Sequence, residues 1–230
     1  MGMKDVVRRL PIVGSLAVRG SGYLRRIGFT GSRDYWEQRY RVGGTSGGGS
    51  MHHLAQFKAD TLNAFVAARG LQSVIEFGCG DGRQLELARY PRYVGLDVSP
   101  TAVKQCVERF PADPAKSFFA YDPTAFFDRA GVFRADLALS LDVIYHLVED
   151  AVFETYMRHL LGAATRYVAI YSSDRDRRSA QPHVRHRNWS AWVAANARDF
   201  RVVERVPNPY KGNDPNSESF ADFTFYERTA

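Results

Sequence analysis

The stretch VIEFGCGDG, residues 74–82, decides the fold of this chain. Its first half is typical of a buried strand, and glycines follow at positions 78, 80 and 82. Glycine is needed there because the backbone must bend tightly and approach a ligand without a Cβ in the way. The stretch therefore predicts a strand that runs directly into a nucleotide-binding turn.

Strands and helices alternate along the chain around this turn. The alternation favours a parallel sheet with right-handed crossovers, which is a doubly wound α/β fold. No long helix fits between the final two strands, so we expect a hairpin and an antiparallel last strand. The expected strands are 73–77, 93–97, 117–121, 135–140, 167–172, 201–206 and 220–226, and the expected helices are 32–40, 54–69, 83–89, 100–109, 149–162 and 188–197.

Acidic residues lie at the ends of three consecutive predicted strands. Glu76 suits S-adenosylmethionine (SAM), whose sulfonium and ammonium groups are cationic, and it would repel a dinucleotide pyrophosphate. Asp97 follows 21 residues later, where a carboxylate holds a ribose diol through two charge-assisted hydrogen bonds. Asp122 is placed to accept from the adenine amino group, with Val98 and Tyr121 against the faces of the ring. Each carboxylate alone has the alternative of a solvated strand end.

These motifs carry a family resemblance. Residues 74–146 resemble the core of the class I SAM-dependent methyltransferases, with VIEFGCGDG as the first motif and GLDVSP, residues 95–100, as the second. LALSLDVIYHL, residues 137–147, is similar to the segment after the fourth strand of that family. The resemblance extends over roughly residues 50–228. It implies a Rossmann-like, seven-stranded sheet whose seventh strand is antiparallel.

The resemblance also implies which residues contact SAM. Carried onto this chain, it points to the turn glycines and to the two later carboxylates. The complete set of predicted cofactor-binding residues is Glu76, Gly78, Cys79, Gly80, Asp97, Val98, Tyr121, Asp122 and Leu141.

His146 is the candidate general base, with Asp142 as a second catalytic candidate. Methyl transfer is an in-line displacement, and a hydroxyl nucleophile must also lose its proton. His146 follows the fourth strand at the edge where open α/β sheets bind ligands, and an imidazole titrates near neutrality. In the small-molecule O-methyltransferases that this segment resembles, a histidine at this place often acts as the base. The alternative is a structural histidine that caps the next helix.

A magnesium ion is a further hypothesis. Asp142 ends the fourth strand, while Asp174 and Asp176 follow the fifth, and neighbouring strand ends meet at one edge of the sheet. Metal-dependent catechol and sugar O-methyltransferases resemble this arrangement. The alternative is that these aspartates are ordinary loop residues.

The polar segment 172–188 and the helix after it favour a small polar acceptor, a saccharide above all. The segment lies over the expected acceptor site, and Trp189 and Trp192 offer faces for sugar rings, unless they belong to the core. YWEQRYRVGGTSGGGS (35–50) and HVRHRNW (183–189) are similar to bacterial methyltransferases of polysaccharide synthesis, and methylmannose 1-O-methyltransferases are one such family. The predicted acceptor-binding residues are Tyr145, Asp174, His183, His186 and Trp189.

The charge and the glycine content together suggest three parts of the chain. These are a basic arm (1–31), a helix with a glycine-rich lid or linker (32–50) and a methyltransferase domain (51–230). The first 41 residues hold nine Lys and Arg against three Asp and Glu, an excess that equals the whole net charge of +6. The remainder is neutral, which argues against a nucleic-acid partner. The arm has two interpretations: an anchor at an anionic membrane surface, or packing on its own domain or on the partner of a homodimer.

Two cysteines that need no disulfide favour a reducing, cytoplasmic setting. The leading function is thus SAM-dependent O-methylation of a saccharide hydroxyl. The alternatives are methylation of another small molecule, of RNA or of protein, and a non-catalytic SAM-binding module. The segment after the fourth strand lacks an Asn-Pro-Pro-Tyr-type motif, which argues against exocyclic base amines as targets.

Overall fold

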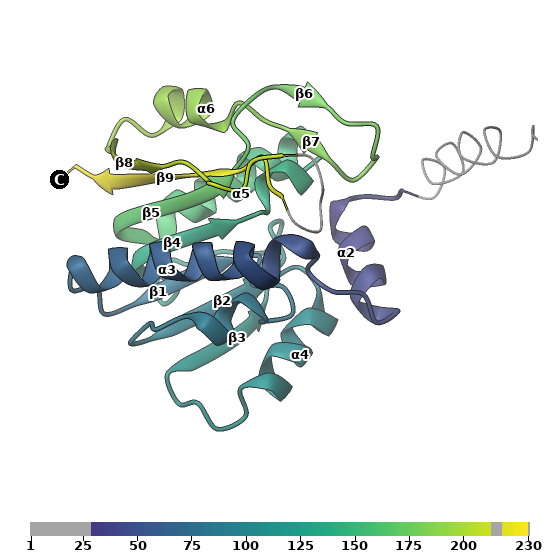
Figure 1. Cartoon of the computed structure of the whole chain (residues 1–230), viewed down its shortest axis with the longest axis horizontal. Coiled ribbons are helices and arrows are strands. Elements are labelled where there is room, and N and C mark those ends of the chain that lie inside the picture. The colour runs from purple at the N-terminus through teal and green to yellow at the C-terminus, as the bar shows by residue number, and fades with distance from the viewer. Residues whose placement is uncertain (1–28, 213–217, 230) are drawn as a thin grey trace, which may run out of the picture.

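A seven-stranded sheet forms the centre of the molecule (Figure 1). The computed structural model describes residues 29–212 and 218–229. The strand order is β3-β2-β1-β4-β5-β9-β8. The strands are β1 (Val74–Phe77), β2 (Tyr93–Asp97), β3 (Lys116–Ala120), β4 (Ala135–Leu141), β5 (Ala164–Ser172), β8 (Phe200–Val206) and β9 (Asp222–Arg228).

The direction of the strands confirms the predicted fold. The pairs β1–β2, β1–β4, β2–β3 and β4–β5 are all parallel. The last strand, β9, is inserted between β5 and β8 and is antiparallel to both. The chain therefore has the mixed sheet with one reversed strand that the closing hairpin predicted.

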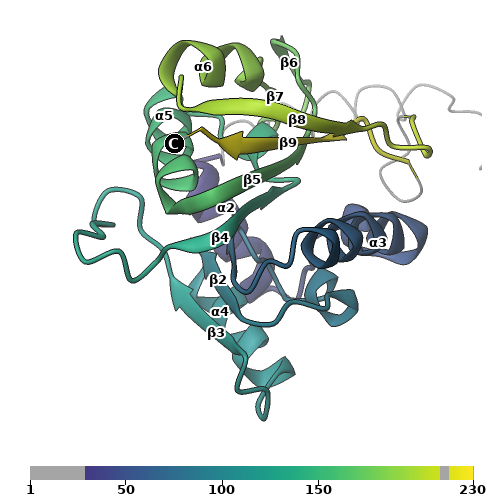
Figure 2. The same cartoon turned by 90° about the vertical axis from the view of Figure 1, so that its left-hand side faces the viewer.

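Helices cover both faces of the sheet, as the end-on view shows (Figure 2). One core contains side chains of α3 and α4, and the other contains side chains of α5 and α6. All four residues of β1 are buried, which is why its sequence is apolar apart from Glu76 and does not alternate with polar residues. The helices are α2 (Ser32–Arg41), α3 (His52–Ala68), α4 (Pro100–Arg109), α5 (Asp150–Ala163) and α6 (Trp189–Asn196), with short 3-10 helices η1 (Gly48–Ser50), η2 (Gln84–Leu87) and η3 (Ile144–His146).

Local details differ from the sequence predictions in two places. The segment predicted as a helix over 83–89 is the short η2. The polar segment 172–188 contains a small hairpin, β6 (Arg177–Arg178) with β7 (Arg185–His186). At the start of α2, the Ser32 hydroxyl bonds to Glu149 and to the carbonyl of His146.

Most of the predicted basic arm, residues 1–28, lies outside the described residues. Within residues 29–212 and 218–229, none of the helices combines the length and the hydropathy that crossing a membrane requires. The glycine-rich segment follows α2 and contains η1, and it leads directly into α3.

Candidate active site

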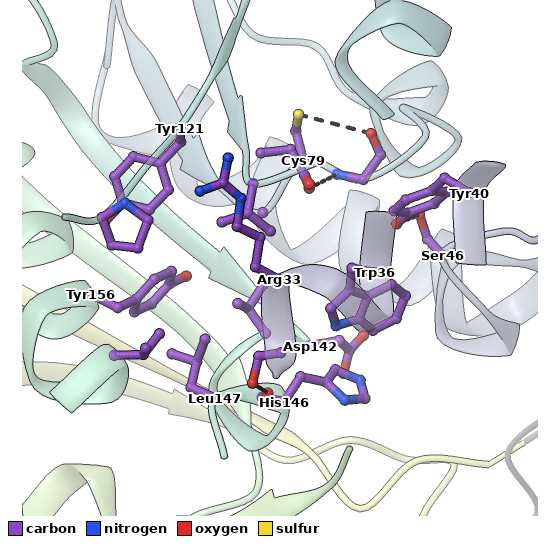
Figure 3. Close-up of a pocket in the computed structure, with 18 of the residues that line it drawn as sticks. Arg33, Trp36, Tyr40, Ser46, Cys79, Tyr121, Asp142, His146, Leu147 and Tyr156 are labelled. Atoms are coloured by element: carbon purple, nitrogen blue, oxygen red, sulfur yellow. Dashed lines mark hydrogen bonds between the residues drawn. The ribbon is translucent and has the colours of Figure 1, made fainter. Parts of the chain in front are cut away.

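A cavity of about 300 Å³ lies at the carboxyl ends of the central strands. Its walls come from the turn after β1, the ends of β2, β3 and β4, and helix α2 (Figure 3). All the residues predicted to bind the cofactor line this one cavity, together with Asp142 and His146. The topology thus brings the three predicted motifs together at one edge of the sheet.

The turn after β1 has the shape that its glycines suggested. Gly78 has a φ of +86° and Gly80 a φ of +58°, a region that side chains with a Cβ rarely adopt. A Cβ on Gly80 would lie 2.3 Å from the Ser46 hydroxyl. Ser46 also donates to Asp81 at 2.9 Å, so the glycine-rich segment lies directly on the turn. Gly80 is therefore required both by its positive φ and by the close approach of the glycine-rich segment.

Asp97 is a buried carboxylate at the end of β2, in the wall of the cavity. Its two carboxylate oxygens accept from the backbone N–H groups of Gly80 at 2.9 Å and Ser99 at 2.8 Å. Each oxygen keeps a further lone pair for a ribose hydroxyl. Burial raises the pKa of Asp97 to about 6. A buried carboxylate with spare acceptor capacity fits the predicted ribose contact.

Glu76 is a second buried carboxylate on the same wall. The Tyr93 hydroxyl donates to it at 2.6 Å. Burial raises the pKa of Glu76 to about 7, and the hydrogen bond from Tyr93 and the charge of Lys58 oppose that rise. A cationic ligand in the cavity would stabilise the ionised forms of both carboxylates.

We therefore expect the affinity for SAM to weaken as the pH falls from about 8 to about 5. At low pH the raised pKa values leave Glu76 and Asp97 protonated, so a cation must displace protons to bind. Each displaced proton costs up to about tenfold in affinity per pH unit below the pKa of the free protein. Calorimetry across this range measures the effect, with thermal unfolding as the control for folding. An affinity independent of pH would contradict the expectation, and Glu76→Gln should flatten the dependence.

Asp122 is held differently from the other two carboxylates. It is partly exposed and accepts from Thr124 through one oxygen and from Arg33 at 2.8 Å through the other. These bonds to Thr124 and Arg33 hold the pKa of Asp122 below its usual range. Arg33 comes from α2 and was not predicted as a site residue. Tyr121 beside it is buried, and its hydroxyl bonds to His159.

His146 lies in η3 with its ring edge-on to Trp36, at 4.8 Å between centroids. Its Nδ1 is 2.9 Å from the backbone carbonyl of His183. A carbonyl only accepts, so Nδ1 carries the hydrogen and Nε2 keeps its lone pair. Burial lowers the pKa of His146 to about 4, so the ring is neutral at physiological pH. The ring is therefore in the protonation state that a general base needs.

Asp142, directly after β4, has a φ of +59°. Its carboxylate accepts from Lys58 at 2.8 Å and from the Tyr145 hydroxyl at 3.0 Å. Lys58 was missed by the sequence analysis, although a signal was present. It lies four residues from Leu54 and from Leu62, on the stripe of α3 that is buried. A charged residue in that stripe indicates a buried partner or ligand.

The predicted magnesium ligands line different cavities. Asp142 lines the cavity of about 300 Å³, whereas Asp174 lines another one and accepts from the backbone N–H of Ser190 at the start of α6. Asp176 lines neither cavity. Within the described ranges, no group of three or more His, Cys, Asp and Glu side chains is arranged to hold a metal.

Trp189 does not line the cavity of about 300 Å³. It is buried in the core, with 1% of its surface exposed, and its indole N–H donates to the Ser173 carbonyl at 3.0 Å. The ring packs edge-on against Tyr226 in β9. This burial fits the alternative that the tryptophan belongs to the core.

Another cavity, of about 790 Å³, adjoins the cavity of about 300 Å³ and is separate from the one that Asp174 lines. We call it the second cavity, and the cavity of about 300 Å³ the first. The two share Trp36, Ser46, Asp142 and His146 as lining residues. Three of the predicted acceptor-binding residues line the second cavity: Tyr145, His183 and His186. Asp142 and His146 thus lie between the cavity predicted to hold the cofactor and a larger cavity lined by aromatic and polar groups.

Comparison with known families agrees with this geometry. Residues 75–169 match a family described as a methyltransferase domain. The match begins in β1 and ends in β5, so it contains the glycine turn, Asp97 and His146. A comparison with curated proteins found no match.

Solved methyltransferase structures share the fold. The N-methyltransferase NodS from Bradyrhizobium japonicum WM9, in complex with S-adenosyl-L-homocysteine (SAH), is 15% identical with a TM-score of 0.64, covering 86% of this chain and 98% of NodS. Magnesium protoporphyrin IX methyltransferase (ChlM) from Synechocystis PCC 6803 with bound SAM is 16% identical with a TM-score of 0.60, covering 88% and 99%. The methyltransferase domain of a bacterial Hen1, CtHen1-C, is 18% identical with a TM-score of 0.59, covering 76% and 98%.

The reversed strand β9 and the glycine turn define the class I methyltransferase fold. The chain thus contains a methyltransferase domain over residues 75–169, on the fold of solved methyltransferase structures that hold SAM or SAH.

Proposed function

We propose that this enzyme transfers the methyl group of SAM to a hydroxyl of a small polar acceptor, and that the acceptor is a saccharide. The observation that carries the proposal is the place of His146 between the two cavities, with Nδ1 fixed by the His183 carbonyl. An amine nucleophile that is already neutral needs no base, whereas a hydroxyl must give up a proton as it attacks. A neutral imidazole whose Nε2 has no hydrogen-bond partner among the described residues supplies that function.

The chain's own residues account for the rest of the reaction. When bound, SAM supplies an electrophilic methyl group, and the oxygen–carbon bond forms as the carbon–sulfur bond breaks. Nε2 of His146 takes the hydroxyl proton, and Nδ1 stays bonded to the His183 carbonyl. Trp36 and His183 pack against the ring and hold its orientation. Such positioning supports an in-line displacement.

The second cavity supports a sugar as the acceptor. Tyr35 stacks on His183 at 4.2 Å between centroids, and Phe220 lies edge-on to Tyr145 and to His186. Aromatic rings offer flat apolar surfaces to the faces of a sugar, and polar side chains between them bind its hydroxyls. This mixture lines the described part of the cavity.

The test is a panel of acceptors with methyl-labelled SAM. We expect label in neutral mono- and oligosaccharides, and none in the same sugars with their free hydroxyls blocked as methyl ethers. Amino sugars, catechols, a peptide and an RNA transcript complete the panel. Label that enters only the amines, the peptide or the RNA would overturn the proposal. Mass spectrometry of the product then identifies the methylated oxygen.

A further inference from the structure

Lys58 places a buried cation in the wall of the cofactor cavity. It comes from α3, outside the matched domain, and only 1% of its side chain is exposed. Its Nζ bonds to Asp142 at 2.8 Å and lies over the ring of Tyr171 at 5.5 Å from the centroid. An ammonium has three N–H donors, and the bond to Asp142 uses one. A buried lysine that lines a cavity therefore has capacity for a second acceptor.

The charges around the cavity determine what that acceptor is. Arg33 and Lys58 are the only Lys and Arg side chains among the described residues that line it, and Arg33 is bonded to Asp122 at the end of β3. Glu76 and Asp97 are buried carboxylates of the same wall. An anionic ligand group near them would be repelled unless a cation is beside it. Lys58 is the cation placed to receive such a group.

Gln84 in η2 adds a second, independent observation. Its Nε2 donates to the carbonyl of Ala55 in α3 at 3.0 Å. Its Oε1 is buried and has no hydrogen-bond partner among the described residues. Gln84 lines the same cavity as Lys58. A buried acceptor without a donor costs free energy, which indicates that a ligand N–H completes it.

We propose that Lys58 and Gln84 form the subsite for the amino-acid end of SAM. Lys58 binds the α-carboxylate, and Oε1 of Gln84 accepts from the α-ammonium. Both side chains are supported by α3, so this helix positions the methionine end while the turn after β1 positions the nucleoside. The proposal rests on SAM as the cofactor and is independent of the identity of the acceptor.

Decarboxylated SAM tests the role of Lys58, because it lacks the carboxylate and keeps the sulfonium and the amine. We expect the wild-type protein to bind SAM about 10- to 100-fold more tightly than decarboxylated SAM, the range of a charge-assisted hydrogen bond. Lys58→Met should weaken SAM binding by about that factor and leave decarboxylated SAM nearly unaffected, so that the preference disappears. Gln84→Met should weaken both ligands alike, because both carry the amine.

The controls separate this role from a structural one. Lys104→Met removes an exposed lysine of α4 and should leave the preference intact. Lys58→Arg keeps a cation and should retain most of it. Thermal unfolding reports whether each variant is folded. Equal binding of the two ligands by the wild-type protein would overturn the proposal without any variant, as would an unchanged preference in Lys58→Met. Neither result would bear on whether the acceptor is a saccharide.

Discussion

Replacing His146 with Gln should lower kcat by about 10²- to 10⁴-fold, the usual contribution of a general base. The affinity for SAM should change little, because the imidazole lies at the border with the second cavity and its hydrogen bond goes to the His183 carbonyl. Glutamine keeps a polar side chain of similar reach but cannot take up a proton. Single-turnover transfer from labelled SAM measures the chemical step apart from product release.

The matched control is His52→Gln, at an exposed histidine at the start of α3 that lines neither cavity. It should keep full activity. A His146→Gln enzyme with unchanged kcat would remove the imidazole from the mechanism, and a large loss of SAM affinity would point to a structural role instead. Because burial lowers the pKa of His146 to about 4, its protonation should not limit the wild-type rate near neutral pH.

Asp97→Ala should weaken SAM binding by about 100-fold or more. The change removes two charge-assisted hydrogen bonds to the ribose, each contributing about 1.5–3 kcal/mol. It also removes the acceptor for the Gly80 N–H at 2.9 Å, so the glycine turn loses its support. Calorimetry with SAM and with SAH should show the same loss, because the ribose is common to both.

Asp60→Ala is the control for Asp97→Ala, since Asp60 is an exposed carboxylate on α3. It should bind SAM normally. Asp97→Asn separates charge from shape, and we expect an intermediate affinity because one amide oxygen remains as an acceptor. Binding within about threefold of wild type in a folded Asp97→Ala protein would place the ribose elsewhere.

The parts of the site that follow local rules were predictable from the sequence. The turn at Gly78 and Gly80 requires positive φ, and that requirement is visible in the residues themselves. The acidic strand ends at Glu76 and Asp97 follow from strand length and sheet direction, and both line the predicted cavity.

The ion pairs across the site were not predictable in this way. Arg33 pairs with Asp122 across 89 residues of chain, and Lys58 pairs with Asp142 across 84. No local pattern specifies such a pairing, because it depends on how α2 and α3 pack on the sheet. The position of Asp174 was not predictable for the same kind of reason, because it depends on the hairpin after β5 and on the start of α6.

Helix α2 contributes to both cavities, through Arg33 to the first and through Trp36 to each of them. It is fastened by the Ser32 hydroxyl to Glu149 at 2.6 Å and by Glu37 to the Ser99 hydroxyl at 2.6 Å. A displacement of this helix would therefore change the walls of both cavities at once, so these two hydrogen bonds couple the shape of one cavity to that of the other.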